Sequence, residues 1–344
     1  MSDLQIGLIS LGVVLIVIVV CFNWWQDRRV RQRMQAHFPE GDHDPLMVGA
    51  GAASSRREPG LPSADGGAVP NQGQEGDEEA EADPTCEAVL DIAFAHPVAG
   101  QVLREAIRGI VKVGAKPVRV MATDDAGAHR LSPRDDGHYV SLQLAVLLAN
   151  RGGPLTDIEW SQLWSLAQSL AEQFEGAVEG PEQEHVLARA RELDALCASL
   201  DAQVGLAVKL GGTLPIEEVA KAVRDAGFLV YGRQLAWMSE AGIPRFTILF
   251  DGLAYGDVQS AGVDRLDLLL DLPHSPADAQ AFSRMASVGR DLAARLAGEL
   301  VDDQGRPLAE GRDQSIDVQL AELYGKLQQH GLPAGEMRTV RLFS

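Results

Sequence analysis

The stretch DRLDLLLDLP, at Asp264–Pro273, carries a clear strand pattern in the globular part of the chain. Leucine occupies the even positions from 266 to 272, and the residues between these positions are Asp267, Leu269 and Asp271. Successive side chains of a strand point to opposite faces, so the even leucines are expected to face covering helices. The alternation therefore predicts a strand of a sheet whose other face, with Leu269, is open.

The flanking sequence predicts the rest of an α+β unit over residues 201–344. The predicted strands are AQVGLAVKL (202–210), RQLAWMS (233–239), PRFTILFDG (244–252) and a strand–turn–strand at 299–308. The predicted helices cover residues 216–228, 275–298 and 315–331, the second with Ser275 as its cap and Pro276 at its first position. Strands and helices in this order favour an antiparallel sheet with helices on one face.

The same alternation selects the side chains expected on the open face. Val204, Leu206 and Val208 are bulky and are expected to face the helices, which leaves Gly205 and Ala207 outward. Leu235 and Trp237 share one side of a short strand and are also assigned outward. The predicted trough has these residues: Gly205 and Ala207 as its floor, with Leu235, Trp237, Leu249 and Leu269 as its walls. Such a trough suits the apolar side of a short peptide, although an outward Leu is commonly ordinary surface and Trp237 has a core position as its alternative.

Residues 85–200 repeat this order of elements. The predicted strands cover 86–97, 118–121 and 139–149, and the predicted helices cover 100–113, 156–174 and 182–200. The best internal match sets residues 165–183 against 287–305, where in both a helix ends near a glycine and leads into a valine and an acidic turn. The sequence thus predicts two tandem α+β units, the first a diverged copy. One larger α+β domain with accidental similarity is the alternative.

The N-terminus predicts a membrane anchor. LQIGLISLGVVLIVIVVCF, at Leu4–Phe22, is uncharged, and about 20 helical residues span a hydrocarbon core of ~30 Å. The acidic start MSD and the bulky CFNWW favour a retained helix over residues 4–25 rather than a cleaved signal peptide. The flanking residues are Trp24, Trp25, Arg28, Arg29, Arg31 and Arg33. Tryptophan suits the headgroup level and arginine stays cytoplasmic, so residues 1–3 are expected in the periplasm and the body in the cytoplasm of a single-pass inner-membrane protein.

Composition narrows the remaining function classes. Residues 26–84 combine the basic juxtamembrane segment with a tract rich in Gly, Ala, Pro and acidic residues, which predicts a disordered linker. The formal net charge of −19 argues against a nucleic-acid partner. The sequence has no C-x-x-C, H-x-x-x-H, G-x-S-x-G or GK[ST] motif, so we expect no enzyme, no metal or other cofactor and no small-molecule substrate.

Residues 201–331 resemble the ZipA family of bacterial cell-division proteins. The resemblance rests on AQVGLAVKL, on AGF at 226–228, on LDLLLDLP at 266–273 and above all on the acidic hairpin LVDDQGRPL at 300–308. It implies a periplasmic N-terminus, one membrane helix, a linker, and a C-terminal domain whose open sheet face binds the C-terminal tail of FtsZ, the tubulin-like division protein. The chain departs from the family in its short acidic linker and in its additional first unit, whose role the resemblance does not supply.

The resulting hypothesis is a cell-division adaptor that binds the FtsZ C-terminal peptide and tethers the Z ring to the inner membrane during septum assembly. The alternative is a membrane-tethered ligand sensor or envelope-assembly scaffold. An exposed apolar strip on the second unit favours peptide binding, whereas a closed polar pocket between the two units favours a sensor.

Overall fold

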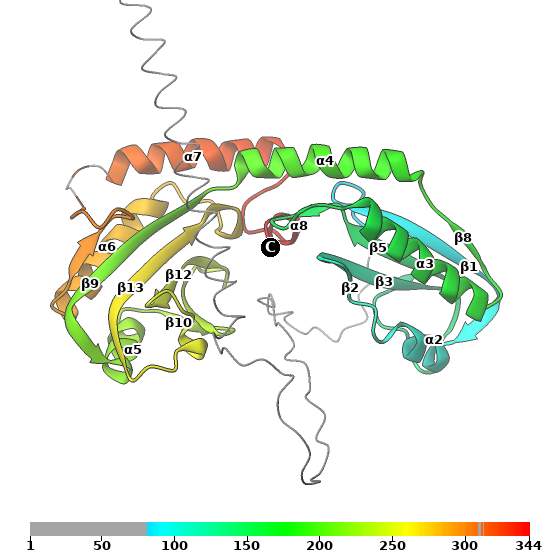
Figure 1. Ribbon diagram of the computed structural model, residues 1–344, viewed down its shortest axis with the longest axis horizontal. Helices are drawn as coiled ribbons and strands as arrows, with labels where there is room; N and C mark the ends of the chain where they lie inside the picture. The colour runs from blue at the N-terminus through cyan, green and yellow to red at the C-terminus, as the bar shows by residue number, and fades with distance from the viewer. Residues whose placement is uncertain (1–80, 309–310, 312) are drawn as a thin grey trace, which may run out of the picture. The chain divides into compact units, whose positions relative to one another are not determined.

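The computed structural model describes residues 81–344 except 309, 310 and 312. These residues form an α+β structure with two six-stranded antiparallel sheets and a two-stranded hairpin. Each large sheet is built from consecutive parts of the chain, as Figure 1 shows by its colours. We call residues 81–200 the first lobe, with the first sheet, and residues 201–344 the second lobe, with the second sheet.

The second sheet has the strand order β10-β11-β12-β13-β9-β14. Its strands are β9 (Gln203–Pro215), β10 (Leu229–Tyr231), β11 (Gln234–Met238), β12 (Pro244–Phe250), β13 (Gly262–Asp271) and β14 (Glu299–Val301). The helices of this lobe are α5 (Ile216–Asp225), α6 (Ala281–Arg295), α7 (Asp313–Gln329) and α8 (Met337–Leu342). Helix α6 packs on β9, β13 and β14, and α7 packs on α6, so the lobe's main helices cover one face of the sheet.

The first sheet has the strand order β2-β3-β5-β1-β8, with β4 paired to β3. Its strands are β1 (Glu87–Ala99), β2 (Lys112–Val113), β3 (Lys116–Asp124), β4 (His129–Arg130), β5 (His138–Leu147) and β8 (Ala177–Glu179). The remaining elements are the hairpin β6 (Ala149–Asn150) and β7 (Gly153–Pro154), with helices α2 (Gly100–Ile107), α3 (Asp157–Gln173) and α4 (Gln183–Leu200). Helix α3 begins at a capping box of Thr156 and Glu159 and packs on β1 (Figure 1).

The central strand pairs of the two sheets have the same register. Glu87 lies opposite Leu147 at one end of β1 and β5, as Gln203 lies opposite Asp271 on β9 and β13. Near the other end, the pairing register shifts after Ala93 in the first sheet and after the equivalent residue Lys209 in the second. Beyond the shift, Val98 faces Tyr139 in the first sheet and Leu214 faces Val263 in the second.

The ends of α3 and α6 repeat each other as well. A residue with positive φ follows each helix, Glu175 at 51° and Ala297 at 50°. The next residue, Gly176 or Gly298, donates back to the helix over 2.7 or 2.8 Å. A Cβ at either glycine would lie within 2.7 Å of a carbonyl oxygen of the adjacent long strand, so the close approach of the edge strand requires glycine there. The lobes therefore share connectivity and register, while their origin by duplication stays a prediction.

Several predicted boundaries are wrong for local reasons. Ser275 does not cap α6, because its hydroxyl donates to the Arg245 carbonyl and the helix begins only at Ala281. The first-lobe helix predicted over 100–113 ends at Ile107, since β2 follows. The short elements β2, β6, β7, β10 and α8 were not predicted, because two to six residues carry too little periodicity.

The disordered linker predicted to end at residue 84 is wrong for its last four residues. Glu81–Pro84 contact the body, where Asp83 pairs with Arg338 across 2.5 Å. The predicted membrane helix over 4–25, with Trp24, Trp25 and the four arginines after it, lies outside the described residues. Within residues 81–344, the structure has no helix with the length and apolar character needed to cross a bilayer.

An arginine of the first lobe links the two lobes. Arg151, in the turn between β6 and β7, binds Asp201 through Nη2 at 2.6 Å and Asp271 through Nη1 at 2.6 Å. Cys86 and Leu147 of the first lobe are also part of the same core cluster as Leu342 and Phe343. The lobes are therefore joined by both an ion-pair network and continuous apolar packing.

Replacing Asp271 by Asn should change the acid sensitivity of the fold. Burial alone would raise the pKa of Asp271, but hydrogen bonds and charge from His274 and Arg151 lower it to about 2. A lowered folded pKa gives stability that is present above the unfolded value near 3.8 and is lost as pH falls toward 2. We expect Asp271→Asn to lower the free energy of unfolding by about 2 kcal/mol at pH 7 and to flatten its decline between pH 4 and 2.

Urea denaturation across this pH range measures the effect, and Asp264→Asn, at an exposed position of β13, is the matched control. If Asp271→Asn and Asp264→Asn lowered the free energy of unfolding equally at pH 7, the stabilising role of the Arg151 network would be contradicted.

Candidate peptide-binding face

One face of the second sheet forms the core of its lobe. Its side chains come from alternate positions of the strands and are almost fully buried: Leu206, Val208, Phe246, Ile248, Phe250, Leu266, Leu268 and Leu270. They pack in one cluster with Phe282, Met285 and Leu292 of α6. Burial of these side chains fixes the orientation of every strand, and the intervening residues must lie on the opposite face, which we call the open face.

Two rows of residues cross the open face from strand to strand. The register places the first row as Leu229, Ala236, Thr247, Leu269 and Gly205, from edge strand β10 to β9. The second row consists of Leu249, Asp267, Ala207 and Val301, from β12 to the other edge at β14. Leu249 and Leu269 are half-buried, and Leu269 lies next to Gly205, so the two leucines form a shallow apolar surface.

Four of the six residues predicted for the trough lie on this face. Gly205 and Ala207 line its floor, and Leu249 and Leu269 stand on the neighbouring strands. A Cβ built on Gly205 would come no closer than 3.8 Å to its nearest neighbour, the Leu268 carbonyl oxygen. The position of Gly205 therefore has room above it.

The outward assignment of Leu235 and Trp237 is wrong. Leu235 lies opposite Ile248 and is fully buried, and Trp237 lies opposite Phe246. The Trp237 ring stacks on Phe246 at 6.0 Å and meets the edge of Phe228 at 5.7 Å. This aromatic packing places both residues on the helix-covered face.

Three apolar residues of the open face were missed: Leu229, Ala236 and Val301. Ala236 lies between the two bulky residues Leu235 and Trp237. The rule that placed small residues outward on β9 would have found it. Leu229, 59% exposed, and Val301, only 3% exposed, lie on short edge strands whose pairing the sequence does not reveal.

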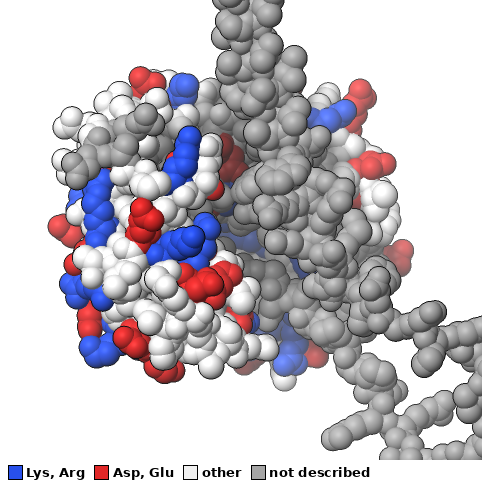
Figure 2. All heavy atoms as spheres, turned by 60° about the vertical axis from the view of Figure 1, so that its left-hand side comes forward, with Lys and Arg blue, Asp and Glu red and all other residues white. Residues whose placement is uncertain are grey.

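Charged groups lie within and beside the two rows. Asp267 accepts from Arg265 at 2.6 Å, and Asp271, at the far end of β13, is held by Arg151, His274 and Gln203. On the side of the second lobe seen in Figure 2, Lys and Arg are interspersed with Asp and Glu, and the described surface shows no large block of one sign. A ligand of the open face would therefore meet the paired charge of Asp267 next to Leu249, within the second row, and the charge network of Asp271 at the end of β13.

The two cysteines of the described residues belong to the core. Cys86 and Cys197 are both free and buried, and burial raises the pKa of each thiol to about 12. They are therefore protonated at neutral pH and act as small apolar side chains.

A comparison with protein families finds a match within the second lobe. Residues 255–319 match the family described as ZipA, C-terminal FtsZ-binding domain, which confirms the predicted resemblance. The matched segment includes β13 with Leu269, helix α6 and β14 with Val301. No curated protein matches the chain.

Truncation of Leu235 and truncation of Leu249 should lower the free energy of unfolding by different amounts, because the two residues lie on opposite faces of the sheet. Leu235→Ala is expected to lower the free energy of unfolding by about 2–4 kcal/mol, because it leaves a cavity in the core. Leu249→Ala is expected to cost less than about 1 kcal/mol, because its side chain is only half-buried. Urea unfolding of both variants gives the two values, and equal costs would contradict the assignment of faces.

Proposed function

We propose that this chain is a membrane-anchored cell-division adaptor whose second lobe binds the C-terminal tail of FtsZ. The observation that carries the proposal is the match of residues 255–319 to an FtsZ-binding domain family. The open face supports it, because Leu249 and Leu269 stand on a sheet surface opposite the helices.

The proposed contact uses side chains rather than added strands. On the interior strands β9, β12 and β13, each ladder is already paired on both sides, so a peptide lying over them finds few free backbone groups. Apolar side chains of the peptide would instead pack between Leu249 and Leu269 above Gly205 and Ala207. Burial of apolar surface contributes a favourable free energy of about 25 cal/mol per Å², so a shallow face supports moderate affinity.

Moderate affinity is sufficient if many copies act together at one surface. In the proposal, residues 4–25 cross the inner membrane once with the N-terminus in the periplasm, and the linker places the body in the cytoplasm. An FtsZ polymer would then be held by many tethered contacts at once, which gives strong collective attachment to the membrane during septum assembly. The role is that of an adaptor and requires no catalytic group.

Peptide binding by the full chain tests the proposed site. We expect a synthetic FtsZ C-terminal peptide to bind, and Leu249→Glu or Leu269→Glu to weaken binding at least about tenfold, because each places a charge against the apolar part of the peptide. Calorimetry or fluorescence anisotropy measures the affinity.

Val230→Glu is the matched control, since Val230 is 68% exposed on β10 and lies opposite Leu235, on the other face of the sheet. The proposal fails if no binding is seen at several hundred micromolar peptide, or if the two open-face variants bind like the control.

The location of the protein in living cells tests the adaptor role. A fluorescently tagged chain should form rings at midcell, and Leu269→Glu should disperse these rings along the membrane. Deletion of residues 4–25 should move the signal into the cytoplasm. Even membrane staining by the unaltered chain would contradict a role in division.

A further inference from the structure

The chain covers part of the first sheet with its own residues 81–85, which we call the strap. A turn closed by Asp83, whose carbonyl accepts from Cys86 at 3.1 Å and from Glu87 at 2.8 Å, folds the strap back over the sheet. Ala82 then packs in a small apolar cluster with Met121, Ala145 and Val89, and Met121 and Ala145 are fully buried. These side chains lie on the face opposite α3, since the alternate residues Leu90, Val120 and Leu144 form the core with that helix.

The shared register identifies what the strap covers. Val89, Ala145 and Arg119 lie opposite one another, as Gly205, Leu269 and Thr247 do in the second sheet. The next row along the same face contains Met121, and its counterpart in the second sheet contains Leu249. Ala145 and Met121 therefore take the positions of Leu269 and Leu249. Ala82 thus occupies in the first lobe the place where the proposed partner peptide would lie in the second.

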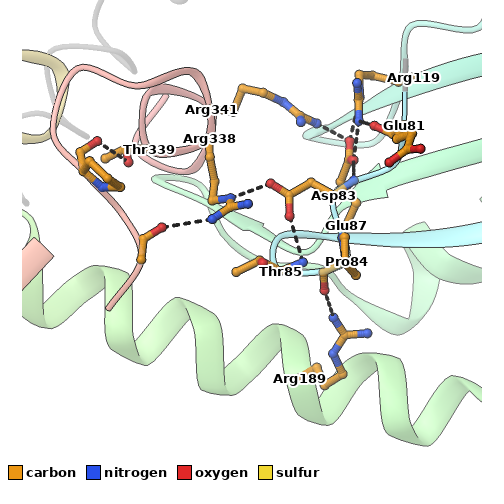
Figure 3. Close-up of polar contacts among 12 residues, drawn as sticks. Glu81, Asp83, Pro84, Thr85, Glu87, Arg119, Arg189, Arg338, Thr339 and Arg341 are labelled. Carbon is orange, nitrogen blue, oxygen red and sulfur yellow. Dashed lines mark hydrogen bonds and ion pairs between the residues drawn. The ribbon is translucent and has the colours of Figure 1, made fainter. Parts of the chain in front are cut away.

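Arginines from three separate elements fasten the strap (Figure 3). Arg119 of β3 donates to the Glu81 carbonyl at 2.9 Å, Arg189 of α4 donates to the Pro84 carbonyl at 2.5 Å, and Arg338 of α8 donates to Asp83 at 2.5 Å. The buried Glu87 accepts from Asp83 N at 2.7 Å and from Arg119, and also from Arg341 of α8. The strap is therefore held in one defined place by apolar, backbone and charged contacts together.

We propose that the open face of the first lobe is a second site for an apolar peptide segment, which the strap holds closed. The inference rests on the proposed function, and its ligand is the same FtsZ tail. Because the strap directly precedes β1, its effective concentration at the site is high, and a free peptide must compete with it. The unaltered chain thus binds one peptide, and a chain with a released strap binds two.

The proposed site in the first lobe carries more charge than the one in the second lobe. Asp91 and Glu179 are both exposed, whereas Ala207 and Val301 at the equivalent positions of the second sheet are buried. We therefore expect the opened site to bind the peptide more weakly than the second lobe does.

Ala82→Asp in the full chain releases the strap, because it places a charge against Met121 and Ala145. Arg338→Ala releases it in a second way, by removing the partner of Asp83. Calorimetric titration with the FtsZ peptide should give a stoichiometry of one for the unaltered chain and two for either variant. Ala177→Asp, at an exposed position of β8 next to Ala93, is the matched control and should keep a stoichiometry of one.

Double variants distinguish the two sites. Leu269→Glu alone should bind the peptide at least about tenfold more weakly and leave the NMR signal of the Met121 methyl group unmoved, whereas Ala82→Asp with Leu269→Glu should shift that signal. A stoichiometry of one for both strap variants, with the Met121 signal unmoved by peptide, would overturn the second site and leave the proposed function standing. Absence of binding by every chain would overturn both.

Discussion

The burial of alternate leucines along β13 is the constraint on which the second lobe depends. Leu266, Leu268 and Leu270 must face α6, and the pairing with β9 and β12 transmits this orientation to the whole sheet. A shift of register by one residue would turn the buried set toward solvent, so the register is strongly fixed. The side chains left on the open face, Leu249 and Leu269 among them, are therefore a consequence of core packing.

The same constraint acts in the first lobe with a different result. There Leu142, Leu144 and Val146 of β5 are buried against the core, and the pairing with β1 matches that of β13 with β9. The face left over carries smaller or polar residues, and the chain's own Ala82 covers its apolar part. One arrangement of strands thus supports an exposed apolar surface in one lobe and an internally occupied surface in the other. Arg338 and Arg341 of the C-terminal helix α8 connect the two lobes, because they bind Asp83 and Glu87 at the start of the first lobe.

The sequence predicted those strands and helices whose own residues show a strong hydrophobic periodicity. Strong alternation gave β9, β12 and β13, and helical spacing gave α3, α5 and α7. The predicted orientation of Leu235 and Trp237 was wrong, although the small Ala236 between them already indicated that the two bulky residues face the helices, as the pairing with β12 shows. The acidic composition before residue 84 predicted disorder, yet Asp83 is ordered by Arg338, far away along the chain. Ion-pair partners that are distant in sequence are determined by the tertiary fold and cannot be inferred from local composition.

The central claim is that the apolar rows of the second sheet receive the FtsZ tail. The most direct measurement is methyl NMR of the full chain during titration with the FtsZ C-terminal peptide. The account predicts that the methyl signals of Leu229, Leu249 and Leu269 shift together and saturate, while those of Val230 and of Val318 on α7 stay in place. Shifts confined to Val230, Val318 or other positions away from the open face would contradict it.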